Sequence, residues 1–160
     1  MNPNGLGSWI GDWVWSLPLI VLTVVIHVCG LAVIGERVVV AVGESVDRRR
    51  FMLKFAVVMG ATSLLATLLH AIEGGIWAAA YRFLGALPDN RTAMLYSISA
   101  MTTYGHANLY LENRWQLMGA LEALNGVLLF GLTTAFLFSM IQTIWPLRSR
   151  ELHRDRSTIQ

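Results

Sequence analysis

Charged residues and cysteine are both scarce in this sequence of 160 residues. Only 14% of the residues are charged, against about 25% in an ordinary soluble domain. With 55% hydrophobic residues, this excludes a disordered chain, a coiled coil and a typical cytosolic enzyme. The single cysteine, Cys29, excludes a disulfide framework and a cysteine-rich zinc site. The composition is that of an integral membrane protein.

Long apolar runs supply the spanning segments that such a protein needs. About 20 apolar residues cross a bilayer as a helix, because a helix satisfies its own backbone groups where water is absent. Runs of this kind occupy residues 15–42, 52–82 and 115–145. The segment 91–101 is too short to span, and we expect a re-entrant helix there. The predicted fold is an all-α membrane protein with three transmembrane helices and one re-entrant helix.

Basic residues gather in two segments, and this distribution predicts the orientation in the membrane. Three crossings place the region around loop 43–51 and the tail 146–160 on one side, which the positive-inside rule makes cytoplasmic. The N-terminal segment 1–14 and the re-entrant helix then face outward from the inner membrane. We expect the basic loop to meet anionic lipid, and we expect no nucleic-acid partner. Nine of the twelve basic residues lie in the two segments: Arg37, Arg48, Arg49, Arg50, Lys54, Arg148, Arg150, Arg154 and Arg156.

A transmembrane helix, an outward re-entrant helix, a short loop and a second transmembrane helix form the plan of a tetrameric cation-channel pore. The C-terminal end of the re-entrant helix directs a partial negative charge toward the pore axis. Threonine and glycine in the following loop let oxygen atoms replace the water shell of an ion. Four copies are needed to close the ring. The candidate ion-binding residues are Thr102, Thr103, Tyr104, Gly105, His106, Ala107 and Asn108.

The loop and the helix after it resemble a known family. Thr102 and Thr103 match paired threonines, and Gly105 matches a first filter glycine, in the bacterial small ion-channel proteins of the potassium-channel pore superfamily, often labelled two-pore-domain-like. Residues 114–119 (RWQLMG) and 121–126 (LEALNG) match the segment that opens the inner helix. The resemblance implies a homotetramer in which residues 52–82 form the outer pore helix, residues 115–145 form the inner one, and potassium or sodium passes passively.

The loop also departs from the filter of that family, Thr-Val/Ile/Leu-Gly-Tyr-Gly-Asp. His106, Ala107 and Asn108 replace the tyrosine, the second glycine and the aspartate. A Cβ costs about 1 kcal/mol where the backbone needs a positive φ, so potassium selectivity does not carry over. An alternative register aligns Tyr104-Gly105 with the Tyr-Gly of the family, but it shortens the loop. The altered filter also leaves open a non-conducting, channel-like structural or regulatory subunit.

Several polar and small residues lie near this loop in the sequence. Ser97 and Ser99 on the re-entrant helix, with Glu122 and Asn125 on the last helix, are candidate supports for the filter. Glu122 is expected to reach Ser97 or Ser99. His106 is interpreted either as a pH switch or as a neutral packing residue. Two further glycines are open to interpretation as hinges or as sites of close helix packing: Gly126 and Gly131.

Metal binding and catalysis are not expected. Glu73 lies three residues after His70, a spacing that predicts a local hydrogen-bonded pair on one helix face. His27 and Cys29 are expected to serve in helix packing, and nothing in the sequence brings His27 close to the other two residues. No catalytic set or phosphate-binding loop is found, so we expect neither an enzyme nor a bound cofactor apart from the permeant cation.

Overall fold

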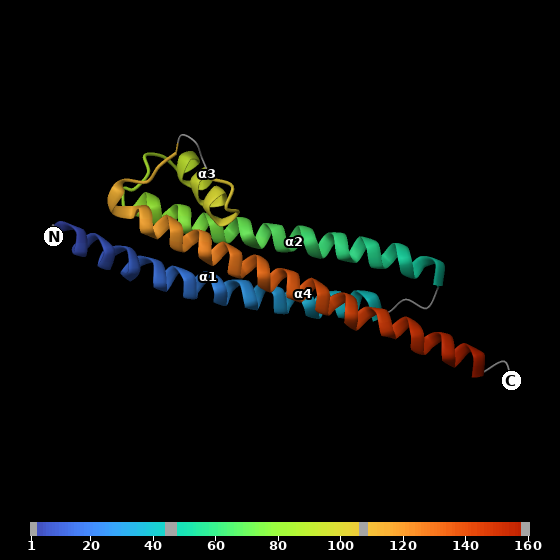
Figure 1. The fold of residues 1–160 in the computed structure, drawn as a ribbon. Helices are drawn as coiled ribbons and strands as arrows, with labels where there is room; N and C mark the ends of the chain where they lie inside the picture. Colours follow the sequence, from blue (N-terminus) through green and yellow to red (C-terminus); the bar gives the residue numbers. More distant parts are fainter. Residues whose placement is uncertain (1–2, 44–47, 106–108, 158–160) are drawn as a thin grey trace.

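The computed structural model describes residues 3–43, 48–105 and 109–157, and the regular structure in these ranges is helical. This confirms the predicted all-helical fold. Figure 1 shows three long helices that run side by side, with a short helix packed at the end of the bundle where the chain begins. The elements are α1 (Pro3–Gly43), α2 (Arg48–Phe83), α3 (Asn90–Met101), the 3-10 turn η1 (Asn113–Trp115) and α4 (Gln116–Ser157).

The three long helices each contain a segment that can cross a membrane, as predicted. These segments are Trp9–Val40, Met52–Phe83 and Gln116–Thr143. Their outward faces carry large apolar side chains that are exposed on the single chain, including Val21, Leu64 and Val127. Such extended apolar surface is rare on soluble monomers and is normal where lipid is the solvent. The chain is therefore a multi-pass membrane protein.

Two helices extend beyond the spans predicted for them. α1 begins at Pro3, so nearly all of the expected N-terminal segment 1–14 is helical. Proline suits the first helical position because its φ is already fixed near the helical value. α4 continues through Pro146 to Ser157, where the sequence predicted that the inner helix stops at 145. One proline removes one hydrogen bond, and the leucine, arginine and glutamate residues beyond it favour the helix.

α1 is an integral part of the bundle and packs on both α2 and α4. Its buried side chains recur every three to seven residues and form one stripe along the helix. The N-terminal half of the stripe is polar and the C-terminal half is apolar. Gly30 and Gly35 allow close approach: a Cβ on Gly30 would contact Leu69 on α2, and one on Gly35 would contact Phe136 on α4. The stripe consists of Asp12, Ser16, Thr23, His27, Leu31, Gly35 and Val38.

α3 lies between α2 and α4, and small residues on both long helices let it approach closely. A Cβ on Gly74 of α2 would lie 3.4 Å from the Ser97 hydroxyl oxygen and from the Met101 sulfur. On α4, a Cβ at Gly126 would overlap the backbone of Met101. An apolar core holds the other end of α3 in place. This core contains Trp77, Ala78, Tyr81, Ala86, Leu87, Ala93, Leu111 and Met118.

Asp89 fixes the start of α3. It is the N-cap residue, and its carboxylate accepts hydrogen bonds from the Thr92 backbone N–H at 2.9 Å and the Thr92 hydroxyl at 2.7 Å. These two hydrogen bonds lower the pKa of Asp89 below its usual value. A lowered pKa means that the charged cap stabilises α3 above the unfolded-state pKa of about 3.9, and that this contribution is lost as the pH falls through the folded-state pKa.

We therefore expect acid to weaken α3 specifically through Asp89. The melting temperature of the wild-type protein in detergent should fall more steeply below about pH 4 than that of Asp89→Asn, which keeps a cap without a titrating charge. The measurement is a series of thermal unfolding curves between about pH 2.5 and 6. Parallel pH profiles for the two proteins would show that the Asp89 charge contributes nothing to folding.

Candidate functional site

The loop after α3 folds back on the last turn of that helix. The Thr103 N–H donates to the Ala100 carbonyl at 3.0 Å, and the Tyr104 N–H donates to the Ser99 carbonyl at 3.0 Å. The Thr102 hydroxyl donates to the Ile98 carbonyl at 2.8 Å. These bonds satisfy carbonyl groups that a helix end leaves free. The first residues of the candidate filter are therefore held rigidly to α3.

The backbone of this loop has an unusual conformation. Thr103 has a φ of 56° and Gly105 has a φ of 70°. Glycine adopts positive φ at no steric cost, but a β-branched residue is an outlier there. Strain of this kind persists only where the surrounding structure imposes it, and it is concentrated at functional sites. Thr103 is thus the most constrained residue of the described loop.

Relieving this strain should stabilise the protein. We expect Thr103→Gly to be more stable than Thr103→Ala by about 1 kcal/mol, because only glycine escapes the Cβ clash of the left-handed region. Both variants remove the same hydroxyl, so their difference isolates the backbone effect. Unfolding in mixed detergent micelles provides the measurement. Equal stabilities would mean that Thr103 does not hold a positive φ in the protein.

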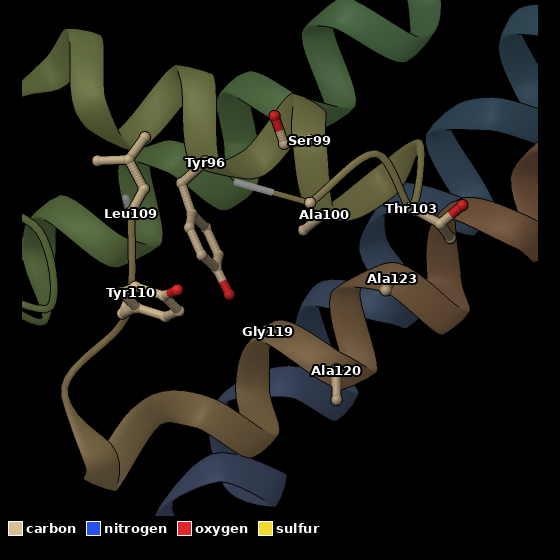
Figure 2. A pocket seen from close by; sticks show the side chains of 10 residues that line it. Tyr96, Ser99, Ala100, Thr103, Leu109, Tyr110, Gly119, Ala120 and Ala123 are labelled. Carbon is tan, nitrogen blue, oxygen red and sulfur yellow. The ribbon is translucent and has the colours of Figure 1, made fainter. Parts of the chain in front are cut away.

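The described filter candidates differ in their surroundings. Tyr104 is 83% exposed on the single chain, so little of its side chain is covered by the rest of the chain. Gly105 and Thr103 line a hollow of about 290 Å³ between α3, the loop and the start of α4. Figure 2 shows this hollow, with Tyr96 reaching from α3 toward Gly119 on α4. Three predicted filter residues lie outside the described residues: His106, Ala107 and Asn108.

Tyr96 forms one wall of this hollow. Burial raises the pKa of its phenol to about 12, so it stays neutral at physiological pH. Its hydroxyl lies where a Cβ on Gly119 would overlap it. Gly119 therefore provides the space that the Tyr96 ring needs, and small residues at 120 and 123 continue the same open face of α4.

Behind α3, Glu122 is fully buried and joins three helices. The Tyr81 hydroxyl on α2 donates to Glu122 Oε2 at 2.7 Å. Ser97 Oγ on α3 lies 2.5 Å from Glu122 Oε1 and 2.7 Å from the carbonyl oxygen of Gly74 on α2. Of the two serines that Glu122 was predicted to reach, it contacts Ser97 on α3. These contacts fix α3 against both neighbouring helices from its buried side.

The contacts of Ser97 bear on the protonation of Glu122. A hydroxyl carries one proton and can donate one full hydrogen bond, yet the Ser97 oxygen lies close to two acceptors. Both contacts are satisfied if Ser97 donates to the Gly74 carbonyl and a protonated Glu122 donates to Ser97. Since an isolated charge is costly in a water-free interior, we expect Glu122 to be a neutral carboxylic acid.

Asn125, the other predicted support on α4, faces α1. Its amide nitrogen donates to the Thr23 hydroxyl oxygen at 2.9 Å, and the Thr23 hydroxyl lies 2.9 Å from the Leu19 carbonyl of its own helix. This bond joins residues 102 positions apart in the sequence. Asn125 therefore links the last helix to the first, and it contacts α1 one turn beyond the buried Glu122.

The two glycines with a possible hinge role have different surroundings. Gly126 is buried against the Met101 backbone at the end of α3, whereas a Cβ on Gly131 would meet nothing within 4 Å. α4 is a continuous helix at both positions. The structure thus gives Gly126 a packing role, and it gives no packing reason for glycine at position 131.

A second buried polar cluster was not anticipated. His27 on α1 lies 2.9 Å from Glu73 on α2, measured between Nδ1 and Oε1, and both side chains are fully buried. His70 Nδ1 lies 3.2 Å from Glu73 Oε2, so the two residues predicted as a local pair are close together, but these two atoms do not form a hydrogen bond. His27 therefore does more than pack. The sequence carries no signal for this contact, because the two residues are 46 positions apart and each is an isolated polar residue in an apolar run.

Comparisons of the chain with protein-family models, with curated proteins and with solved structures find no match. The features that bear on function are therefore the helices, the loop after α3 and the two buried polar clusters.

Proposed function

We propose that this protein is the pore-forming subunit of a homotetrameric channel that conducts potassium or sodium passively. The observation that carries the proposal is the position of α3, which begins at one end of the bundle and ends about a third of the way along the spanning segments Met52–Phe83 and Gln116–Thr143. A helix end at that depth is tolerated only where protein or a water-filled cavity surrounds it. Four copies around an axis would provide such a cavity.

The depth of α3 follows from its glycine contacts. The C-terminal residue Met101 packs on Gly126, which is 126 − 116 = 10 residues after the start of α4 at Gln116. At 1.5 Å per residue this is about 15 Å along the helix axis, or about a third of the 28-residue spanning segment Gln116–Thr143. Gly74, nine residues before the end of α2 at Phe83, gives a similar depth of about 14 Å.

The loop that follows is equipped for contact with an ion. Its N–H groups at Thr103 and Tyr104 are bonded to α3, so the carbonyls of the same two peptides, which belong to Thr102 and Thr103, point away from that helix. The positive φ values at Thr103 and Gly105 direct the chain away from the helix. Exposed carbonyl oxygens in a rigid loop are the groups that cation filters use in place of water. In the proposed pore, the carbonyl oxygens of residues 103–105 would coordinate the permeant cation.

The orientation in the membrane follows from charge. Arg37 and Lys54 lie near the end of the bundle where α1 joins α2, opposite to α3 (Figure 1). With this basic end in the cytoplasm, where anionic lipid would bind it, the N-terminus and the pore loop face outward from the inner membrane. The α4 C-terminus is then cytoplasmic, and α1 surrounds the pore helices on the lipid side.

Flux through liposomes tests this function. Purified protein in liposomes should pass potassium or sodium at some pH between about 5 and 8. Gly105→Ala should reduce the flux about tenfold or more, because each of the four loops gains a Cβ at a positive φ. Gly60→Ala is the matched control, since a Cβ there meets nothing within 4 Å. The absence of flux at every pH, with the protein tetrameric, would refute conduction.

A non-conducting subunit of a membrane complex is the second candidate. It is favoured by the altered filter sequence, in which His106, Ala107 and Asn108 replace the tyrosine, the second glycine and the aspartate of the family that the loop resembles. In this case a different membrane protein should co-purify in fixed stoichiometry. A homogeneous four-fold particle of this chain alone would count against it.

A further inference from the structure

His27, His70, Glu73 and Thr133 form a closed cluster near the middle of the membrane-spanning part. α1 supplies one histidine, α2 supplies the other histidine and the glutamate, and α4 supplies the threonine. The side chains of His27 and Glu73 are fully buried and that of His70 is 11% exposed. Phe130 stacks on the His70 ring, with ring centroids 4.3 Å apart. The cluster is separate from the loop after α3.

The two imidazole rings are oriented in the same way. Each directs Nδ1 toward the Glu73 carboxyl group, at 2.9 Å from His27 and 3.2 Å from His70. Each directs Nε2 toward the Thr133 hydroxyl oxygen, at 3.1 Å in both cases. The ligand atoms of His27, His70 and Glu73 lie within 4.8 Å of one another. Two imidazoles and a carboxylate are therefore close enough together to bind one ion.

Two buried atoms of this arrangement lack a hydrogen-bond partner. His70 Nδ1 and Glu73 Oε2 are buried and face each other at 3.2 Å, yet neither has a hydrogen-bond partner of acceptable geometry. The Thr133 hydroxyl has one proton and faces two Nε2 atoms, so it can donate to only one of them. Unpaired buried polar atoms are costly, and each needs a physical explanation.

We propose that the cluster binds a divalent transition metal ion of the zinc class through His27 Nδ1, His70 Nδ1 and the Glu73 carboxylate. Two imidazoles and one carboxylate are a ligand set that zinc uses, with a fourth position open to water. Ligand atoms about 2.0–2.1 Å from a tetrahedral zinc lie about 3.3 Å from one another. The observed separations of 2.9 and 3.2 Å require only a small outward movement.

Metal binding also resolves the hydrogen bonds at Thr133. With each Nδ1 bound to the metal, each imidazole is neutral and carries its proton on Nε2. Both Nε2–H groups then donate to the Thr133 oxygen, which has two lone pairs. A hydrogen bond from the other ring nitrogen is the usual way in which a protein orients a metal-binding histidine. Thr133 on α4 is thus a positioning residue for both ligands.

A metal at this point would tie α1 to α2 and, through Thr133, to α4. The assignment does not depend on conduction, because none of its residues belongs to the candidate filter. It replaces the expectation from the sequence that no metal is bound. It also explains why two histidines and a glutamate occupy the water-free interior, where ionisable residues are expensive unless they have a function.

Zinc titration of the full-length protein tests the proposal. After removal of metal with a chelator, the protein in detergent should bind one Zn²⁺ per chain in calorimetry. His27→Gln and His70→Gln should each weaken binding by about 100-fold or more, and Thr133→Val by about 10- to 100-fold. Glu36→Gln, an exposed carboxylate on α1, is the control and should bind as the wild type does.

Cobalt spectroscopy covers the case in which the histidine variants do not fold. Wild-type protein loaded with Co²⁺ should show the intense visible bands of a four-coordinate site with nitrogen and oxygen ligands, and zinc should remove them. Two results would overturn the proposal. One is the absence of stoichiometric Zn²⁺ binding and of cobalt bands in the wild type; the other is binding that survives both histidine substitutions and disappears with His106→Gln or His153→Gln.

Discussion

Gly126→Ala is expected to destabilise the folded protein by about 3 kcal/mol, at the upper end of the usual cost of overpacking. The added Cβ would overlap the carbonyl oxygen and the backbone carbons of Met101, and backbone atoms cannot move aside as a side chain can. The last turn of α3 would have to leave α4, and the loop at residues 102–105 would move with it. We therefore expect ion flux to be lost together with stability.

Gly131→Ala is the matched control for this substitution. It lies on the same helix, five residues further along, and its added Cβ meets nothing within 4 Å. It should be neutral or should stabilise the protein by up to about 1 kcal/mol, because alanine favours a helix more than glycine does. Unfolding in mixed detergent micelles measures both variants. Equal effects of the two substitutions would show that α3 does not pack on Gly126.

The same pair of variants separates packing from bending. If α4 bends at position 131 during gating, Gly131→Ala should leave stability unchanged and alter the open fraction in single-channel recordings. At Gly126, which packs on Met101, stability and flux are expected to fall together. Gly126 and Gly131 looked equivalent in the sequence, and only the position of Met101 distinguishes them.

Local patterns explain why much of the fold could be predicted. The three apolar runs exceed the length of a spanning helix, so lengths and charges alone predicted spans at 15–42, 52–82 and 115–145. These overlap the segments Trp9–Val40, Met52–Phe83 and Gln116–Thr143 of the structure. The short helix was predicted at 91–101 and found at Asn90–Met101. Its start is fixed by a local signal, since the Asp89 side chain caps the residues that immediately follow it.

Contacts between distant residues explain what could not be predicted. Thr23 and Asn125 are 102 positions apart, and His27 and Thr133 are 106 apart. Whether such residues meet depends on the rotation of each helix about its axis, and apolar runs with apolar residues on every side leave that rotation undetermined. The sequence therefore predicts only a packing role for His27 on α1, although this residue contacts Glu73 on α2 and Thr133 on α4.

The second large effect is expected at Glu122. Glu122→Ala should destabilise the protein by about 3 kcal/mol, because it leaves a cavity and removes the partner of Tyr81 and Ser97, which are both fully buried. α3 would lose its link to α4 on the buried side. Glu112→Ala is the control: that carboxylate is 58% exposed and pairs only with Arg114, so its loss should change stability by less than about 0.5 kcal/mol.

Glu122→Gln distinguishes a neutral carboxyl group from a charged one. The glutamine carbonyl can accept from Tyr81, and its NH₂ group can donate to Ser97, which in turn donates to the Gly74 carbonyl. Glutamine thereby copies each hydrogen bond of a protonated glutamate, and we expect a loss of about 1 kcal/mol or less. If Glu122 were instead a carboxylate that accepts from the Tyr81 and Ser97 hydroxyls, replacing it by glutamine would remove a charge-assisted hydrogen bond. The glutamine NH₂ group would also face a hydroxyl that is itself a donor. If Glu122→Gln is as unstable as Glu122→Ala, Glu122 is charged in the folded protein. Ser97 then donates its one proton to Glu122, and the Gly74 carbonyl receives no hydrogen bond from Ser97.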